Sequence, residues 1–296
     1  MNLAQREWTD RLLKQVFKTT GLLTIALLAG IFIMLLYNSI AFFLSIKPVD
    51  FFTGFQWNPG TGNNPSYGIL PLLVSTSLVT IGAMVIAIPL GLLTAAFLSE
   101  FAGRRLQTIL KPLIEMLAAI PSVAIGFLGI TIVGPGIASL FHLQSGLNAL
   151  NGSVLLAIMA LPTICTIAED AIHAVPVAYR EGSYALGANK FQTLFSVTLP
   201  AATPGLIAAV MLGVGRAIGE TMTVLMATGN ALAFPKGFLD SIRTITATIA
   251  IEMGEVPYQT THYYALFAIA AVLFIITLLV NIIGEYFANR FRKFQA

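Results

Sequence analysis

The chain has 296 residues, of which 57% are hydrophobic and only 10% are charged. Soluble domains carry about 25% charged residues, so this composition excludes an ordinary soluble enzyme and predicts an all-α membrane protein with several spans. The net charge of +3 says little by itself, and we expect no nucleic-acid partner. The single cysteine, Cys165, lies in an apolar run, which excludes an internal disulfide and predicts a small buried side chain.

Six apolar segments are long enough to cross a hydrocarbon core of ~30 Å as helices that rise ~1.5 Å per residue. In chain order, we expect spans at 21–46, 69–98, 112–133, 153–172, 204–228 and 263–287. Proline should kink or break three of them, at Pro89, Pro121 and Pro162. The stretch Gly-Pro-Gly at 134–136 should end the third span, and a short helix within 241–253 should pack against the bundle.

The basic residues are distributed unevenly along the predicted spans. Of the 16 Lys and Arg residues, 12 fall in segments on the side of the termini, three fall in the opposite segments, and Arg216 lies within a span. The positive-inside rule then places both termini in the cytoplasm. We therefore expect a cytoplasmic N-terminal segment at 1–20, a six-helix transmembrane domain at 21–288 and a basic cytoplasmic tail at 289–296.

A polar loop at 173–200 separates the fourth and fifth spans. Within it a glutamate is followed six residues later by a glycine, and the loop ends in Val-x-Leu-Pro. This spacing resembles the cytoplasmic EAA loop of ABC-transporter permeases, with Gly and Ser in place of two alanines. The positions that the resemblance assigns to ATPase coupling are Glu181, Gly182, Ser183, Gly187, Leu199 and Pro200. In that family the loop forms a coupling helix that docks on a separate ATPase subunit, and the match implies such a helix at about 182–190.

The fifth span holds two ionisable residues near its middle, Arg216 and Glu220. Charged groups at that depth are costly and usually face the bundle interior or a water-filled path. Their i, i+4 spacing would place both side chains on one helical face, within pairing distance. Arg216 would offer a guanidinium fork to a passing oxyanion, while Glu220 would hold Arg216 in place and prevent tight binding. A purely structural ion pair is the alternative.

Other polar residues have simpler explanations. Glu169 and Asp170, at the cytoplasmic end of the fourth span, should lie at the interface and either cap a helix or pair with a nearby basic group. Glu252 should lie on a solvated face, and Trp57 should anchor the chain at a membrane interface. The histidines show no metal-ligand spacing, and the sequence has no Walker-type phosphate loop. We therefore expect no enzyme activity, no cofactor and no metal site in this chain.

Further stretches are similar to the phosphate ABC-transporter permeases of the PstC type, and the likeness covers nearly the whole chain. The more specific matches are Ile-Pro-Ser-Val at 120–123 and Gly-Arg-Ala-Ile-Gly-Glu-Thr at 215–221; others lie at 55–59, 88–91 and 243–250. The resemblance implies the type I importer (MetI-like) permease fold. The PstA type is a close alternative, but the Trp-x-Pro loop before the second span favours the C type.

The same resemblance implies that the chain forms half of a pathway that moves inorganic phosphate into a bacterial cell across the plasma membrane. The implied partners are a second permease of the PstA type, a dimer of a PstB-type ATPase and an extracytoplasmic phosphate-binding protein of the PstS type. ATP hydrolysis would belong to the ATPase, and phosphate would pass Arg216 and Glu220.

Three other functions are open at this point. A permease for phosphonate, sulfate or molybdate would belong to the same class and differ only in its oxyanion. An ion-coupled secondary carrier could use Arg216 and Glu220 as an anion and proton site. However, the sequence shows no convincing inverted repeat, and such a carrier would not need the EAA spacing. A non-transporting scaffold would leave the charges within the fifth span unexplained.

Overall fold

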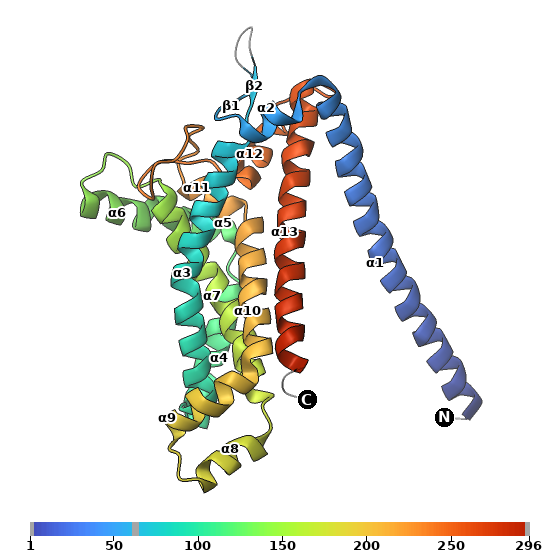
Figure 1. Cartoon of the computed structure of the whole chain (residues 1–296), viewed down its shortest axis with the longest axis vertical. Coiled ribbons are helices and arrows are strands. Elements are labelled where there is room, and N and C mark those ends of the chain that lie inside the picture. The colour runs from blue at the N-terminus through green and yellow to red at the C-terminus, as the bar shows by residue number, and fades with distance from the viewer. Residues whose placement is uncertain (1–2, 61–64, 294–296) are drawn as a thin grey trace.

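A computed structural model of the chain describes residues 3–60 and 65–293, and it is built almost entirely of helices (Figure 1). The elements are α1 (Leu3–Ser45), α2 (Pro48–Thr53), β1 (Trp57–Asn58), β2 (Ser66–Tyr67), α3 (Leu70–Glu100), α4 (Arg104–Ala118), α5 (Ser122–Leu128), the π-helical segment η1 (Gly129–Val133), α6 (Gly134–Phe141), α7 (Ala149–His173), α8 (Val177–Ala185), α9 (Lys190–Thr193), the π-helical segment η2 (Leu194–Thr198), α10 (Leu199–Gly219), α11 (Met222–Ala227), α12 (Ile245–Glu252) and α13 (Thr261–Lys293).

Within the described residues, six helical stretches are long and apolar enough to cross a membrane. They are Leu12–Ser45, Leu70–Glu100, Ser122–Phe141, Ala149–His173, Lys190–Gly219 and Thr261–Arg290. The number of spans and the all-α class confirm the prediction from sequence. The second, fourth and sixth spans begin and end within a few residues of their predicted bounds, because each is a continuous apolar run.

The third span was predicted wrongly at both ends. Residues 104–118 form a separate helix, α4, which ends shortly before Pro121. A proline disfavours helical geometry in the residue before it, so the span begins afresh at α5. Pro135 does not end the span, because it lies in the first turn of α6, where its missing N–H group needs no partner. Figure 1 shows α6 turning sideways, away from the bundle, after η1.

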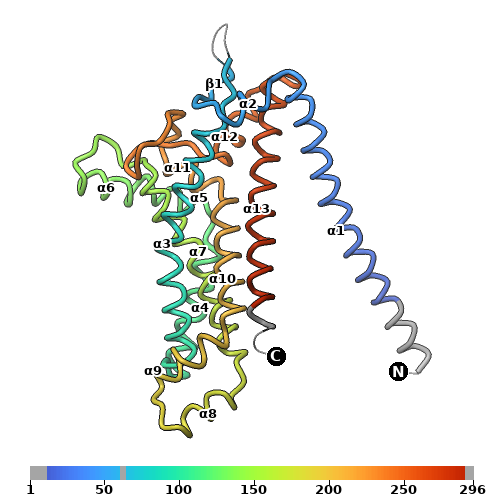
Figure 2. The backbone as a smooth tube through the Cα atoms, viewed as in Figure 1, coloured from blue at the N-terminus to red at the C-terminus, as the bar shows by residue number. Residues whose placement is uncertain are grey.

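Helix α1 is continuous from Leu3 to Ser45, so the predicted boundary at residue 20 is not a break in structure. Its C-terminal part packs on α13, where the rings of Phe32 and Phe274 lie 5.3 Å apart. Toward its N-terminus α1 diverges from the bundle (Figures 1 and 2). Residues 1–2 and residues 294–296 of the predicted basic tail lie outside the described residues.

Three helices, α3, α7 and α10, meet at the side chain of Ile164. A Cβ atom added to Gly91 of α3 would lie 2.8 Å from this side chain, and one added to Gly213 of α10 would lie 2.5 Å from it. Ile164 of α7 is itself fully buried, as is the neighbouring Cys165. Small residues allow membrane helices to approach closely, so these glycines set how closely α3, α7 and α10 pack against one another.

The two ends of the molecule carry different elements. The beginning of α1, the end of α13 and the α8–α9 segment lie at one end, whereas α2, β1, β2 and α12 lie at the other (Figures 1 and 2). The first residues of α1, the last residues of α13 and the predicted coupling loop therefore share one side of the bundle, as an even number of spans requires. That this side is the cytoplasmic one stays a prediction from the charge distribution.

Two expectations for the opposite end were wrong. Trp57 is only 1% exposed and is buried in the core, so it is not an anchor at a membrane interface. Its indole N–H donates to Glu252, which is also buried rather than solvated. A short antiparallel pairing of β1 with β2 places Trp57 beside Tyr67. Burial raises the pKa of the Tyr67 phenol above its ordinary value.

Candidate functional site

The fifth span is broken at Glu220. Helix α10 ends at Gly219, and Glu220 adopts an extended conformation (φ −70°, ψ 133°) before α11 begins at Met222. The prediction of one continuous helix over 204–228 was therefore wrong. The extended conformation redirects the backbone after Glu220, and the described residues show no ion pair between Arg216 and Glu220.

Each of the two charged residues has its own partner. The Arg216 Nη1 atom donates to Thr163 Oγ1 of α7 at 3.2 Å. The Glu220 Oε1 atom accepts from the backbone N–H of Thr223 at 3.4 Å, within the first turn of α11. Arg216 is exposed on this chain, and among the described residues Thr163 is its one side-chain hydrogen-bond partner. A guanidinium has five N–H donors, so several remain available to a group from outside the chain.

The break in the fifth span lies against the break in the third. Thr223 Oγ1 donates to the carbonyl of Ser122 at 3.1 Å, which joins the start of α11 to the start of α5. Close packing continues along both helices, because a Cβ atom added to Gly126 would lie 2.8 Å from the sulfur of Met226. The structure thus brings Ser122, in the stretch 120–123, against the residues that directly follow the stretch 215–221.

Asn151 of α7 joins the two broken spans a second time. Its side-chain amide is fully buried and donates to the carbonyls of Gly129 at 3.0 Å and Ala227 at 3.2 Å. Gly129 begins the π-helical segment η1, and Ala227 ends α11. Segments of π-helix often occur at functional sites, and here one amide ties such a segment to the neighbouring span.

Removing this amide should destabilise the bundle. In Asn151→Leu, two backbone carbonyls each lose a hydrogen bond from a buried amide, so we expect a loss of about 1–3 kcal/mol in the free energy of unfolding. Thermal unfolding of the detergent-solubilised protein would measure the loss. Asn38→Leu is the matched control, because the Asn38 amide bonds only the Met34 carbonyl of its own helix, at 2.8 Å. Equal stability of the two variants would contradict a tie between the spans.

The coupling residues predicted from the EAA-like spacing lie around helix α8. The helix covers 177–185 rather than the predicted 182–190, because Gly187 ends it in a left-handed conformation (φ 84°). Ser183 bonds Thr193 across this turn, with their hydroxyl oxygens 2.9 Å apart. Glu181 and Gly182 are exposed on α8, whereas Leu199 and Pro200 begin α10. The six predicted positions therefore belong to one helix–turn–helix connection.

Ion pairs attach this connection and α4 to the spans. Arg180 Nη2 lies 3.0 Å from Glu100 Oε1 at the end of α3, and it donates to the Ile172 carbonyl of α7 at 2.8 Å. Lys111 Nζ of α4 lies 3.4 Å from Glu169 and 3.8 Å from Asp170. The predicted pairing of Glu169 and Asp170 with a basic group is confirmed. Because Arg180 belongs to α8 and contacts both Glu100 and Ile172, a displacement of α8 would act directly on α3 and α7.

Comparison with known families identifies the class of protein. A family model described as "binding-protein-dependent transport system inner membrane component" matches residues 87–293, which include both broken spans and the connection around α8. The chain belongs to this family. The permease is thus a multi-pass inner-membrane component of an ABC importer, and members of the family work with an ATPase and a substrate-binding protein.

Curated relatives resemble the permease over most of its length. A probable ABC transporter permease protein, YqgH of Bacillus subtilis, is 37% identical over 279 residues, covering 94% of this chain and 90% of the relative. A phosphate transport system permease protein, PstC of Mesorhizobium japonicum, is 33% identical and covers 95% and 90%. PstC of Haemophilus influenzae is 32% identical and covers 97% and 95%. The permease therefore belongs with the PstC type.

Solved structures confirm the predicted fold. A chain of the MetNI methionine ABC transporter in an inward-facing conformation matches with a TM-score of 0.56 and 21% identity, covering 76% of the permease and 94% of that chain. A chain of a bacterial alginate ABC transporter, solved with an alginate pentasaccharide-bound periplasmic protein, matches with a TM-score of 0.65 and 15% identity, covering 98% of both. The permease has the ABC importer fold of the MetI-like type.

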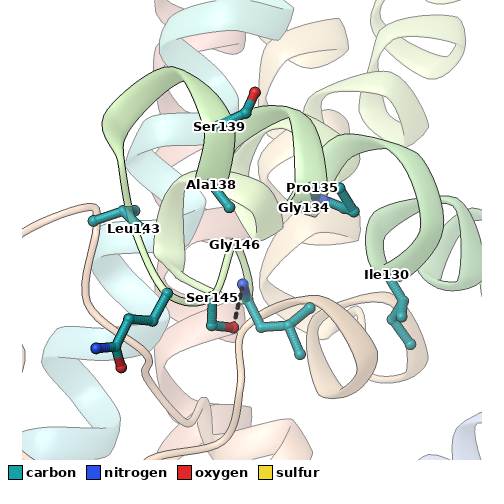
Figure 3. Close-up of a pocket in the computed structure, with 10 residues that line it drawn as sticks. Ile130, Gly134, Pro135, Ala138, Ser139, Leu143, Ser145 and Gly146 are labelled. Atoms are coloured by element: carbon teal, nitrogen blue, oxygen red, sulfur yellow. Dashed lines mark hydrogen bonds between the residues drawn. The ribbon is translucent and has the colours of Figure 1, made fainter.

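The permease also has an open cavity of about 520 Å³ between α6 and the loop at 143–147. Its lining includes the polar side chains of Ser139, Gln144 and Ser145 (Figure 3), and the backbone N–H of Leu147 donates to Ser145 Oγ at 3.2 Å. Neither a charged side chain nor a predicted site residue lines this cavity. It lies along the second half of the third span, in η1 and α6.

The residues that contact Arg216 or hold the two broken spans together were not predicted from the sequence. Thr163, Thr223 and Asn151 carry no motif by themselves, and their roles depend on contacts between helices. One signal was available for Thr163: it follows Pro162, which lies inside α7. A proline within a helix removes a backbone hydrogen bond, and such interruptions in membrane helices often accompany a site.

Proposed function

We propose that this chain is the permease subunit of an ATP-driven importer of inorganic phosphate. The observation that carries the proposal is the exposed Arg216 guanidinium at the end of α10, beside the break at Glu220. An intramembrane arginine with unused donors suits an oxyanion that carries several acceptor oxygens. Relatives named as phosphate permeases cover most of the chain and support phosphate as that oxyanion.

Arg216 and Glu220 would act in sequence rather than as a fixed pair. The guanidinium would bind the phosphate through paired hydrogen bonds. The Glu220 carboxylate, only four residues further along the chain, would repel the anion and limit its residence time. Because the two residues are not paired in this structure, Arg216 needs no ion pair to be broken before it binds phosphate.

Coupling to ATP would occur through the connection at 173–200. Helices α8 and α9 and the turn between them present large apolar side chains to solvent, with Leu186 91% exposed, Phe191 62% and Val177 60%. Contiguous exposed apolar side chains often mark a protein interface. A dimer of a PstB-type ATPase would cover this surface, and the residues that we assign to coupling are Glu181, Gly182, Ser183, Gly187, Leu199 and Pro200. With the ATPase on this surface, α8 and the ends of α1 and α13 beside it would lie in the cytoplasm.

The remaining partners follow from the class of importer. A second permease of the PstA type would cover the exposed face that includes Arg216 and complete the path. An extracytoplasmic phosphate-binding protein of the PstS type would deliver phosphate at the end that carries β1, β2 and α12. The chain would hydrolyse no ATP itself.

Phosphate uptake by the reconstituted complex tests this proposal. Vesicles would contain the two permeases and the ATPase, with ATP inside, and would receive labelled phosphate with the binding protein outside. We expect uptake only when ATP and binding protein are both present, and no uptake of sulfate, molybdate or phosphonate. Uptake of a different oxyanion would reassign the substrate within the class. Uptake that follows a proton gradient without ATP would overturn the proposal in favour of a secondary carrier.

A further inference from the structure

Glu252, at the C-terminal end of α12, is a buried carboxylate with partners from three segments of the chain. Its Oε1 atom accepts from Arg243 Nη1 at 3.0 Å, and its Oε2 atom lies 2.8 Å from His262 Nε2 at the start of α13. The Trp57 indole N–H points at both oxygens, at 3.2 and 3.1 Å. A buried carboxylate persists only when it is well paired, so these contacts fix the end of α12.

The other end of α12 is fixed to α3. The backbone N–H of Ile245 donates to Thr76 Oγ1 at 3.0 Å, and Thr244 caps the helix by accepting from the N–H of Ala247 at 3.2 Å. A helix of eight residues is not stable alone in water. The position of α12 therefore depends on its polar contacts at both ends and on its buried apolar side chains.

Helix α12 holds the break in the fifth span. Thr246 Oγ1 donates to the backbone carbonyl of Glu220 at 2.8 Å. On the far side of the break, Arg243 Nε donates to the carbonyl of Asn230 at 3.0 Å, three residues after the end of α11. One short helix and the arginine before it thus contact the backbone on both sides of α11.

We infer that Glu252 and Thr246 are positioning residues for the substrate path: the Trp57–Arg243–His262 cluster around Glu252 fixes α12, and Thr246 of α12 fixes the backbone of Glu220. The inference rests on the proposed function, because it takes Glu220 as a residue of the path. It adds a role for the opposite end of the permease, where the hairpin of β1 and β2 is connected through Glu252 and α12 to the break in the fifth span.

Thiol labelling at the break tests the inference without reference to any substrate. In a Cys165→Ala background, which removes the single native thiol, Thr221→Cys would report access to the break in the assembled complex. We expect Thr246→Val to change the labelling rate by about threefold or more, the size of typical coupling effects, and Thr246→Ser to restore it. An unchanged rate in Thr246→Val would overturn the role of Thr246.

The role of the Glu252 cluster needs a variant that folds. Removing one member of a buried ion pair is strongly destabilising, whereas replacing both members with neutral residues often changes the stability little. We therefore use Glu252→Gln combined with Arg243→Gln, and Glu255→Gln as control, because Glu255 is an exposed carboxylate of the same connection. We expect the double variant to keep wild-type thermal stability and to change the labelling rate of Thr221→Cys as Thr246→Val does. The Glu255→Gln control should leave that rate unchanged.

Uptake kinetics separate positioning from stability. In the double variant we expect the apparent KM for phosphate to change by about three- to tenfold, with binding-protein-stimulated ATP hydrolysis retained. A double variant that labels and transports like wild type would show that the cluster only holds the outer segments together, and would overturn the inference. If wild-type vesicles take up no phosphate, the proposed function fails, while the labelling result still decides whether α12 positions the break.

Discussion

Vesicles with the Arg216→Ala permease should take up phosphate about ten- to a hundredfold more slowly than wild-type vesicles, the effect of losing a hydrogen bond to a charged group. The guanidinium is exposed at the end of α10, and among the described residues Thr163 alone bonds its side chain. The variant removes donors from the path without breaking an ion pair, so the complex should assemble normally. Initial rates of ATP-dependent uptake of labelled phosphate measure the loss.

Two further variants show whether charge or geometry matters at Arg216. Arg216→Lys keeps the charge but loses the planar fork, so uptake should fall between wild type and Arg216→Ala. Thr163→Val removes the bond at 3.2 Å that orients the guanidinium, and should slow uptake by only a few-fold. Co-purification with the ATPase confirms assembly in each case. Normal uptake by an assembled Arg216→Ala complex would show that Arg216 lies off the path.

Gly187→Val should separate ATP hydrolysis from transport. Gly187 has φ 84° at the turn between α8 and α9, and no heavy atom lies within 4 Å of an added Cβ, so the cost is one of backbone conformation. A left-handed conformation costs a residue with a Cβ roughly 1–2 kcal/mol, and more when it is β-branched. We expect the strained turn to displace α8 and to lower the ratio of phosphate transported to ATP hydrolysed.

Gly187→Asn is the matched control for the turn. It also adds a side chain in open space, but asparagine adopts the left-handed conformation readily, as Asn230 of this chain does at φ 58°. The control should keep most of the coupling. If both variants transport with the wild-type ratio of phosphate to ATP, the turn at Gly187 plays no part in coupling. If both lose coupling equally, the added side chain rather than the backbone is responsible.

The span pattern was predictable because it depends on local properties. The long apolar runs that became α3, α7 and α13 need only length and hydropathy to be recognised, since the membrane acts on each run separately. The third and fifth spans were placed less well because their breaks depend on individual residues. Pro121 signalled one break, but the extended conformation at Glu220 follows a stretch whose composition alone still favours a helix.

The sequence by itself determined the class of protein, the number of spans, the charged residues of the fifth span and the spacing of the loop at 173–200. Only the tertiary structure decided which side chains meet: Arg216 with Thr163, Thr223 with Ser122, and Glu252 with its three partners. Membrane insertion follows from the composition of each segment, whereas a hydrogen bond between helices depends on the rotation, depth and tilt of both. Those quantities are set by close packing, such as that of Ile164 between two glycines, which leaves no periodic signal in the sequence.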